Sequence, residues 1–199
     1  IKVQNIQHTG SSTNAIALAS DGTCTANLTN RTNKNLIING AMLVAQRGTS
    51  GTNSGYGSVD RFRVQYSGTD EAPTQAQVDV ASGTTPYTLG FRKALRITNG
   101  NQTSGAGTSD STHFQYYLEA KDIANSGWNY TSSSSFITLQ FWIKSSVAQN
   151  FQGRVRTRQG TSYNYAFETG SLSADTWTKV TKTVPGNSNL QFDNNTAKN

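Results

Sequence analysis

Three arginines at alternate positions, Arg154, Arg156 and Arg158, are the residues of this sequence best suited to bind an anion. Alternate side chains of a β-strand point to the same face, so a strand here would present all three guanidinium groups together. Guanidinium groups pair in a bidentate manner with carboxylate and phosphate groups. The trio therefore predicts a patch for lipopolysaccharide or an acidic glycan. The alternatives are a solvated outer face or pairing with carboxylates of a neighbouring strand or subunit.

Four aromatic residues in or beside polar loops form a second candidate site. Trp128 and Tyr130 lie in the loop of residues 125–131, and Tyr163 and Tyr165 flank another loop. An exposed aromatic ring can stack on the face of a sugar, while neighbouring Asn and Gln side chains supply directional hydrogen bonds. These four residues are predicted to contact a glycan. The alternative for Trp128 is a core position at the edge of the fold.

Residues for catalysis are few and poorly placed. The two histidines, His8 and His113, do not accompany a Gly-x-Ser-x-Gly motif, so a serine triad is not indicated. Glycoside hydrolysis needs two converging carboxylates, and Glu119 and Asp122 are expected on a strand and in the turn that follows it. The Gly-rich stretch 100–107 precedes neither a lysine nor a helix, unlike a phosphate-binding loop. The sequence predicts a protein that is not an enzyme and needs no cofactor.

Charge and cysteine content narrow the function classes further. The net charge is +6 and the pI is about 9.6, yet no run of four basic residues occurs, which argues against a nucleic-acid-binding arm. The single Cys24 cannot form an intrachain disulfide or a cysteine-only metal site. No stretch of 18 apolar residues occurs, so no membrane span is predicted. A calcium ion held by loop oxygens would have no recognisable motif here.

The elements that must position these residues are predicted to be strands. The chain is rich in uncharged polar residues, but 8 Tyr, 8 Phe and 3 Trp favour a folded protein over a disordered one. The clearest strand is 136–144, where Ile137, Leu139, Phe141 and Ile143 form one apolar face. Trp142 in this strand and Trp177 in a later one are expected to be structural.

Further strands are expected by the same alternation of apolar and polar residues. No window of 11 residues shows helical periodicity, so the class is all-β, and a two-sheet antiparallel sandwich accounts for many strands at this spacing. The additional predicted strands span residues 60–66, 76–80, 95–98, 113–120, 152–158, 163–168 and 177–184.

The N-terminal residues 1–34 are predicted to form a separate attachment segment and linker. Two short apolar pieces, 1–6 and 15–19, flank a turn-rich stretch and precede Asp21-Gly22, a turn signal. An isolated hairpin is marginal in water, so this one is expected to pack on the main domain, another chain or a larger assembly. The main domain is then residues 35–199.

Several motifs in order resemble those of jelly-roll domains in structural proteins of tailed phages. In that family an "N-x-I-x-N-G-x-M-x-x-x-Q-R" strand leads to a "D-R-[FW]" strand. Residues 35–48 and Asp60-Arg61-Phe62 match it. Gln115 and Glu119, with one more residue between them, fall where that family has its "Q-x-x-E" strand. Later matches are 139–146 with "L-S-F-W-V-K-S-S" and 177–186 with "W-x-K-x-x-x-T-I-P-G". The N-terminal segment 3–22 is similar to leaders of phage fibre proteins.

The resemblance implies a carbohydrate-binding-like jelly roll on a phage particle. Such proteins are virion appendages, namely fibres, spikes or decorations, and they are often homotrimers that recognise host-surface sugars. The implied partners are other virion proteins, contacted through the N-terminal segment, and a host glycan. The alternative is a purely structural head-decoration or tail-joining protein. The family pattern continues with further strands after residues 193–195, which implies completion by another chain or a longer protein.

Overall fold

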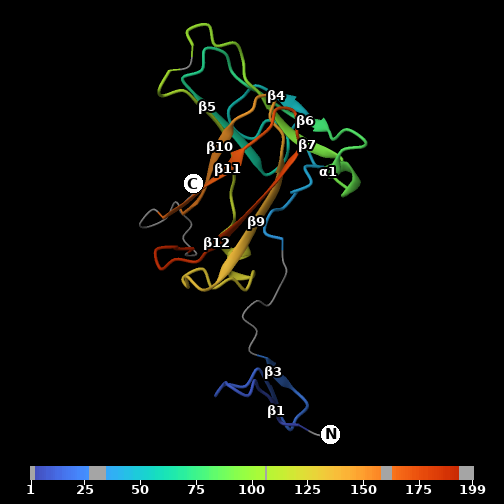
Figure 1. Ribbon diagram of the computed structural model, residues 1–199, viewed down its shortest axis with the longest axis vertical. Helices are drawn as coiled ribbons and strands as arrows, with labels where there is room; N and C mark the ends of the chain where they lie inside the picture. The colour runs from blue at the N-terminus through green and yellow to red at the C-terminus, as the bar shows by residue number, and fades with distance from the viewer. Residues whose placement is uncertain (1–2, 27–34, 106, 158–162, 193–199) are drawn as a thin grey trace.

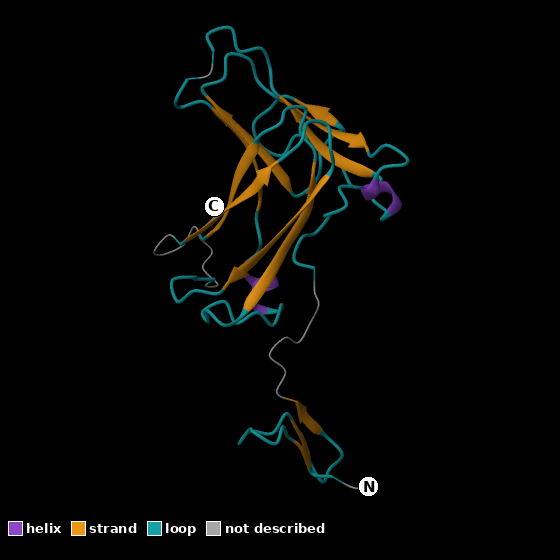
Figure 2. Cartoon of the chain, in the orientation of Figure 1, coloured by secondary structure: helices purple, strands orange, loops and turns teal. Residues whose placement is uncertain are grey.

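The computed structural model describes residues 3–26, 35–105, 107–157 and 163–192 of this chain. Strands dominate it, and the described residues include two short helices, α1 (Thr85–Thr88) and α2 (Ala120–Ala124) (Figures 1 and 2). Every pairing between the described strands is antiparallel. The predicted all-β class is confirmed, and the antiparallel sheets are consistent with a β-sandwich.

The described strands pair into five small sheets. Two sheets have three strands each, in the orders β1 (Asn5–Ile6), β2 (Ile16–Leu18), β3 (Cys24–Ala26) and β4 (Ser50–Gly51), β6 (Thr74–Asp79), β7 (Lys93–Thr98). The other three sheets are pairs of strands: β5 (Phe62–Ser67) with β8 (Ser111–Tyr116), β9 (Phe136–Ile143) with β12 (Thr178–Pro185), and β10 (Asn150–Arg156) with β11 (Asn164–Ser171).

The strongest sequence pattern gives the longest uninterrupted ladder, between β9 and β12 (Figure 1). The register pairs Phe141 with Val180 and Ile137 with Val184, and both valines are fully buried. Apolar cross-strand pairs on one face stabilise a sheet and fix its register, because a slip of one residue would expose them. Trp142 and Trp177 are half-buried.

The predicted strand 113–120 is too long. β8 ends at Tyr116, and α2 begins at Ala120, with the amides of Asp122 and Ile123 donating to the Glu119 carbonyl at 2.9 and 3.2 Å. The Ile123 side chain is buried and anchors this turn. A helix of five residues is too short to show a period of 3.6, so the sequence pattern could not reveal it.

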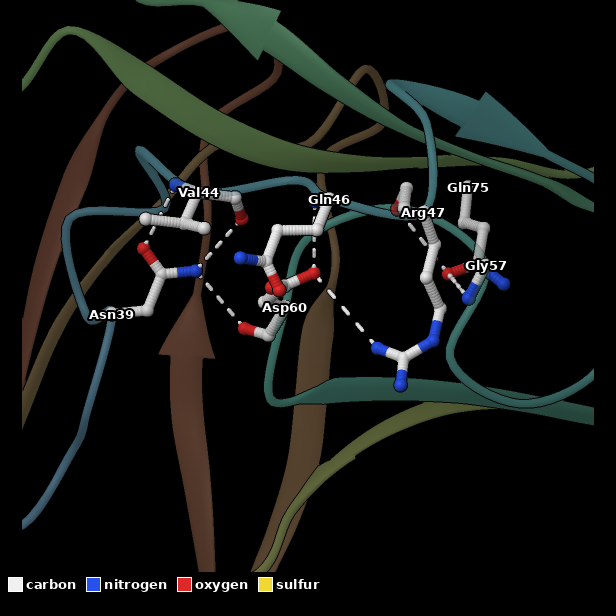
Figure 3. A network of polar contacts seen from close by, with 8 residues as sticks. Asn39, Val44, Gln46, Arg47, Gly57, Asp60 and Gln75 are labelled. Carbon is white, nitrogen blue, oxygen red and sulfur yellow. Dashed lines mark hydrogen bonds and ion pairs between the residues drawn. The ribbon is translucent and has the colours of Figure 1, made fainter.

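The motif "N-x-I-x-N-G-x-M" is not a strand, contrary to what the resemblance implied. Asn39 and Met42 have φ angles of 59° and 56°, and the segment is a turn. The Asn39 amide group donates to the carbonyls of Val44 and Asp60 at 3.0 Å each, and its oxygen accepts from the Val44 amide at 3.1 Å (Figure 3). Asn tolerates the left-handed region better than most residues, so its side chain and backbone both suit this position.

The main buried cluster contains Ile123, Trp128 and Leu190. Partly buried residues surround it, namely Leu36, Leu118, Tyr130, Ile137, Tyr163 and Phe192. Gly186 lies against the loop before β9, since a β-carbon on it would be 2.4 Å from the Ser132 carbonyl oxygen. The end of β12 therefore approaches this loop closely enough to require glycine.

The N-terminal segment forms its own sheet of three strands, one more than the predicted hairpin. The Asp21 carboxylate accepts from the amide and hydroxyl of Thr23 at 2.9 and 2.7 Å, which fixes the turn between β2 and β3. Most of the predicted linker lies outside the described residues, as does Arg158. No helix within the described ranges is long and apolar enough to cross a membrane.

Candidate functional site

One face of the β5–β8 sheet carries polar side chains contributed by both strands. Phe62 and Val64 on β5 are buried, so Arg63 and Gln65 between and after them point to the opposite face. The register places Arg63 opposite Gln115 and Gln65 opposite His113. We call Arg63, Gln65, His113, Gln115 and the adjacent Tyr117 the polar face.

Hydrogen bonds run from residue to residue along this polar face. Arg63 Nη1 donates to the Tyr117 hydroxyl at 3.2 Å, which donates to Gln115 Oε1 at 2.9 Å. The Gln115 amide nitrogen lies 3.1 Å from His113 Nε2. The chain of contacts holds the four side chains in one arrangement, so a ligand would meet donors and acceptors that are already ordered.

An open pocket of about 290 Å³ adjoins the polar face beyond the end of β8. It is lined by Arg47, Tyr56, Arg61, Tyr117 and Glu119. The Arg61 guanidinium donates to Glu119 Oε1 at 2.9 Å, and Lys121 Nζ lies 2.9 Å from Glu119 Oε2. This volume is near the lower end of small-ligand clefts, which start at about 300 Å³. The pocket therefore suits a single small polar group such as one sugar unit.

Glu119 and the two cations beside it, Arg61 and Lys121, stabilise one another's charged forms. Hydrogen bonds from Lys121 and then Arg61 lower the pKa of the Glu119 carboxyl below its ordinary value. The hydrogen bond to Glu119 raises the pKa of Arg61 above its ordinary value. The carboxylate thus stays an acceptor at neutral pH, and both cations stay donors.

Arg61 has a backbone conformation that an arginine rarely adopts, with a φ of 74°. The neighbouring Asp60 is fixed on several sides: its amide donates to the Val44 carbonyl at 2.9 Å, and its carboxylate accepts from the Gln46 amide at 3.1 Å (Figure 3). Arg47 Nη1 lies 3.9 Å from the same carboxylate. Strained residues of this kind cluster at functional sites, where surrounding contacts maintain them.

The loop that carries Tyr56 rests on a buried glutamine, Gln75 of β6, which is 1% exposed. Gln75 Oε1 accepts from the Gly57 amide at 3.3 Å (Figure 3). It also accepts from the Ser58 hydroxyl at 3.3 Å, and the Gln75 nitrogen donates to the Asn53 carbonyl at 2.8 Å. A β-carbon on Gly57 would lie 2.6 Å from Gln75 Nε2. The buried amide group therefore fixes the loop and places Tyr56 at the pocket.

The predicted arginines of β10 lie near enough to His113 of the polar face for their charges to act on it. Arg154 and Arg156 are exposed, whereas Val155 between them is half-buried. Desolvation of the ring, followed by the charges of Arg154, Arg156 and Arg63, lowers the pKa of His113. A second hollow of about 290 Å³ is bordered by Ser111 and Thr112 at the start of β8 and by Gln149 and Phe151 at the start of β10. The starts of these two strands therefore border one hollow.

The predicted stacking role of Trp128 is wrong, and its alternative as a core residue is correct. Trp128 is 7% exposed, and its indole nitrogen donates to the Ser135 carbonyl at 3.2 Å. The rings of Tyr130 and Phe192 lie 6.4 Å from it, centroid to centroid. The polar loop folds over the ring, so the ring presents no open face to a sugar.

The predicted tyrosines also lie apart from the arginines. Tyr130 and Tyr163 are half-buried and pack against the Trp128 cluster. Tyr165 is half-buried opposite Val155, on the face of the β10–β11 ladder that points away from Arg154 and Arg156. These contacts make packing the main role of the three rings, so the structure does not bring the predicted aromatic and arginine groups into one site.

The pocket residues Tyr56, Arg61 and Glu119 were not predicted as ligand contacts. The sequence indicated part of this arrangement. Arg61 and Arg63 alternate with apolar residues, which indicates that they lie on an exposed face but does not identify a binding site. Glu119 comes from a distant segment that the β5–β8 pairing brings alongside. Within the described residues, no group of three His, Cys, Asp or Glu side chains is placed to hold a metal ion.

In comparisons with known proteins, no family model, no curated protein and no solved structure matched this chain.

Proposed function

We propose that this chain is an attachment module of a tailed-phage particle, not an enzyme, and that it binds host-surface carbohydrate in the pocket beside the polar face. The observation that carries the proposal is the pocket itself, which combines two tyrosines, two arginines and an ionised glutamate. The phage setting, the virion location and the jelly-roll form of the sandwich are supported by the sequence resemblance.

The chemistry of the pocket suits a sugar. A sugar unit offers hydroxyl groups that both donate and accept, together with a less polar ring face. Glu119 accepts from hydroxyl groups, Arg61 donates to them, and the rings of Tyr56 and Tyr117 provide flat apolar surfaces. The guanidinium of Arg47 lies 5.7 Å from the Tyr56 ring centroid, which keeps that ring beside a cation.

The same contacts support binding without hydrolysis. A glycosidase needs a carboxyl group that stays protonated near neutral pH as the general acid. Glu119 has the opposite tendency, because Lys121 and Arg61 stabilise its charged form. We therefore propose that the pocket holds a sugar and leaves its glycosidic bonds intact.

The test is glycan binding by the purified chain and by a Glu119→Gln variant. The variant removes one charge from an exposed ion-pair group, so its folding should be preserved. Asp79→Asn is the control, because Asp79 forms an exposed pair with Lys93 at 2.6 Å on another sheet. We expect Glu119→Gln to weaken binding on a glycan array about tenfold or more, and Asp79→Asn to leave it unchanged. Failure of the wild-type chain to bind any glycan would overturn the proposal.

A purely structural role in the virion is the second candidate, and the N-terminal sheet favours it. Val3, Ile6 and Leu18 in this small unit are each at least 42% exposed. An exposed apolar group on a unit of three very short strands fits docking onto another virion protein. If this role is correct, the labelled wild-type chain will bind the phage particle and an Ile6→Lys variant will not. The wild-type chain will also show no glycan binding. We also propose that the chain is a homotrimer; light scattering that gives the mass of a monomer would contradict this.

A further inference from the structure

We infer that Arg63, His113, Arg154 and Arg156 form a second subsite that binds the anionic groups of an acidic polysaccharide, and that this subsite binds more tightly as the pH falls. The inference rests on the proposed glycan binding and names the charge class of the ligand. We call these four residues the cationic subsite.

The geometry brings the four residues from three strands onto one surface. The β5–β8 register makes Arg63 and His113 diagonal neighbours on the polar face. Arg154 and Arg156 are alternate residues of β10, so both side chains lie on its exposed face. Their partners on β11 are Ala166 and Asn164, respectively. Arg154 and Arg156 lie close enough to His113 for their charges to act on its ring, and β8 and β10 begin beside a common hollow.

Within the described part of the chain, the guanidinium groups of the cationic subsite form no ion pair with a carboxylate. Glu168 shares the exposed face of the β10–β11 ladder, but its carboxylate accepts from the Asn150 amide at 2.7 Å. Glu119, which lies beyond the end of β8, forms its ion pairs with Arg61 and Lys121. The cationic subsite therefore carries at least three positive charges that a ligand could neutralise, and relief of their mutual repulsion adds to binding.

The arrangement favours a polysaccharide over an isolated ion. Alternate residues of a strand lie about 6.6 Å apart, so Arg154 and Arg156 can each engage a separate anionic group along a repeating chain. Arginine binds both carboxylate and phosphate groups through paired hydrogen bonds. Both kinds of anion are therefore tested. A ligand that also reaches Tyr117 would contact the proposed sugar pocket, because Tyr117 lines that pocket and accepts a hydrogen bond from Arg63 of the subsite.

His113 makes the subsite sensitive to pH. Among the described residues, the charged groups that act on it are cations, namely Arg154 and Arg156 from β10 and Arg63 from β5, while its own strand contributes the neutral Gln115. Desolvation and these cations lower the pKa of His113, which favours the uncharged ring in the free protein. A bound anion favours the charged ring and raises its pKa. Because proton and anion favour each other, affinity for the anion must rise as the pH falls.

The experiment uses calorimetric titration of the whole chain at pH 7.5 and pH 5.5 with polygalacturonate, dextran phosphate and neutral dextran. An Arg154→Gln/Arg156→Gln variant tests the subsite. A Lys144→Gln/Lys179→Gln variant is the control, because it removes two exposed positive charges from the β9–β12 region. We expect at least one acidic polymer to bind about tenfold more weakly to the arginine variant and within about twofold of wild type to the control.

The pH dependence gives an independent readout. We expect wild-type affinity to rise severalfold from pH 7.5 to 5.5, and His113→Gln to remove most of that rise. Nuclear magnetic resonance of the His113 ring should show its pKa increasing when polygalacturonate or dextran phosphate is added. An unchanged His113 pKa, or equal loss in the lysine control, would overturn the inference. Stronger binding to duplex DNA than to either polymer would also overturn it.

The outcome separates this inference from the proposed function. If Glu119→Gln abolishes glycan binding while the arginine variant binds every polymer as wild type does, the sugar pocket stands and the cationic subsite does not. If neutral and acidic polymers both fail to bind the wild-type chain and its glycan array is blank, the proposed function fails as well.

Discussion

A single glycine, Gly153 in the middle of β10, offers the sharpest test of the packing between strands. Gly153 lies opposite Phe167 of β11, and the phenyl ring covers the glycine. A β-carbon at position 153 would lie 2.4 Å from Phe167 Cζ and 2.6 Å from Cε2. The same ring lies 6.3 Å from the Phe141 ring, centroid to centroid, so it joins β11 to β9. We predict that Gly153→Ala displaces this ring and destabilises the protein.

The magnitude follows from two opposing effects. Overpacking of a fitted site costs about 1–3 kcal/mol. Alanine in place of glycine recovers about 0.5–1 kcal/mol, because the unfolded chain loses freedom. Gly153 has no positive φ, so the alanine backbone is not strained. The expected net loss in the free energy of unfolding is about 1 kcal/mol and at most about 2.5 kcal/mol.

A second substitution, Phe167→Leu, should reverse the effect of Gly153→Ala on the free energy of unfolding. Phe167→Leu removes Cζ and both Cε atoms, which are the three atoms closest to the added β-carbon. In the Phe167→Leu background the clash is gone, so Gly153→Ala should stabilise by about 0.5–1 kcal/mol. The measurement is urea unfolding of the four proteins of the double-mutant cycle. If Gly153→Ala destabilised both backgrounds equally, the proposed contact with the Phe167 ring would be refuted.

Three further predictions concern other parts of the fold. Trp128→Ala should lower the free energy of unfolding by about 3–5 kcal/mol in urea titration, and a loss below about 1 kcal/mol would contradict its burial. Gly186→Ala should cost about 1–3 kcal/mol or more and lower the melting temperature, because the Ser132 carbonyl oxygen blocks the new methyl group; an unchanged melting temperature would disprove this close approach. The Glu119 carboxyl has a lowered pKa in the folded protein, so its stabilising effect is present above the unfolded pKa and is lost as the pH falls through the folded pKa. Glu119→Gln should therefore flatten the acid side of the stability profile, and an identical profile would contradict the ion pairs.

The strand pattern was readable from sequence because burial in a sheet alternates from residue to residue. In β9, Ile137, Leu139 and Phe141 point inward, and the observed bounds agree with the predicted strand to within one residue. The same local rule predicted that Arg154 and Arg156 share an exposed face, which the structure confirms. It failed at α2 because five residues cannot show a helical period.

The composition of the candidate site depended on tertiary contacts. Arg63 and His113 belong to strands that are far apart in the chain, and only the β5–β8 register makes them neighbours. Trp128 lies among polar residues, and its burial depends on Leu190, which comes much later in the chain. The polar residues around Trp128 correctly predict a loop, but they do not show that this loop covers a buried ring.

The sequence by itself determined the all-β class, the approximate strand bounds and the alternation of exposed and buried side chains, because these follow from backbone geometry over a few residues. The tertiary structure alone decided which strands are neighbours, and therefore which charges meet. Arg61 pairs with Glu119 and His113 faces Arg154 because long-range packing selects one pairing of strands. No local pattern encodes that choice.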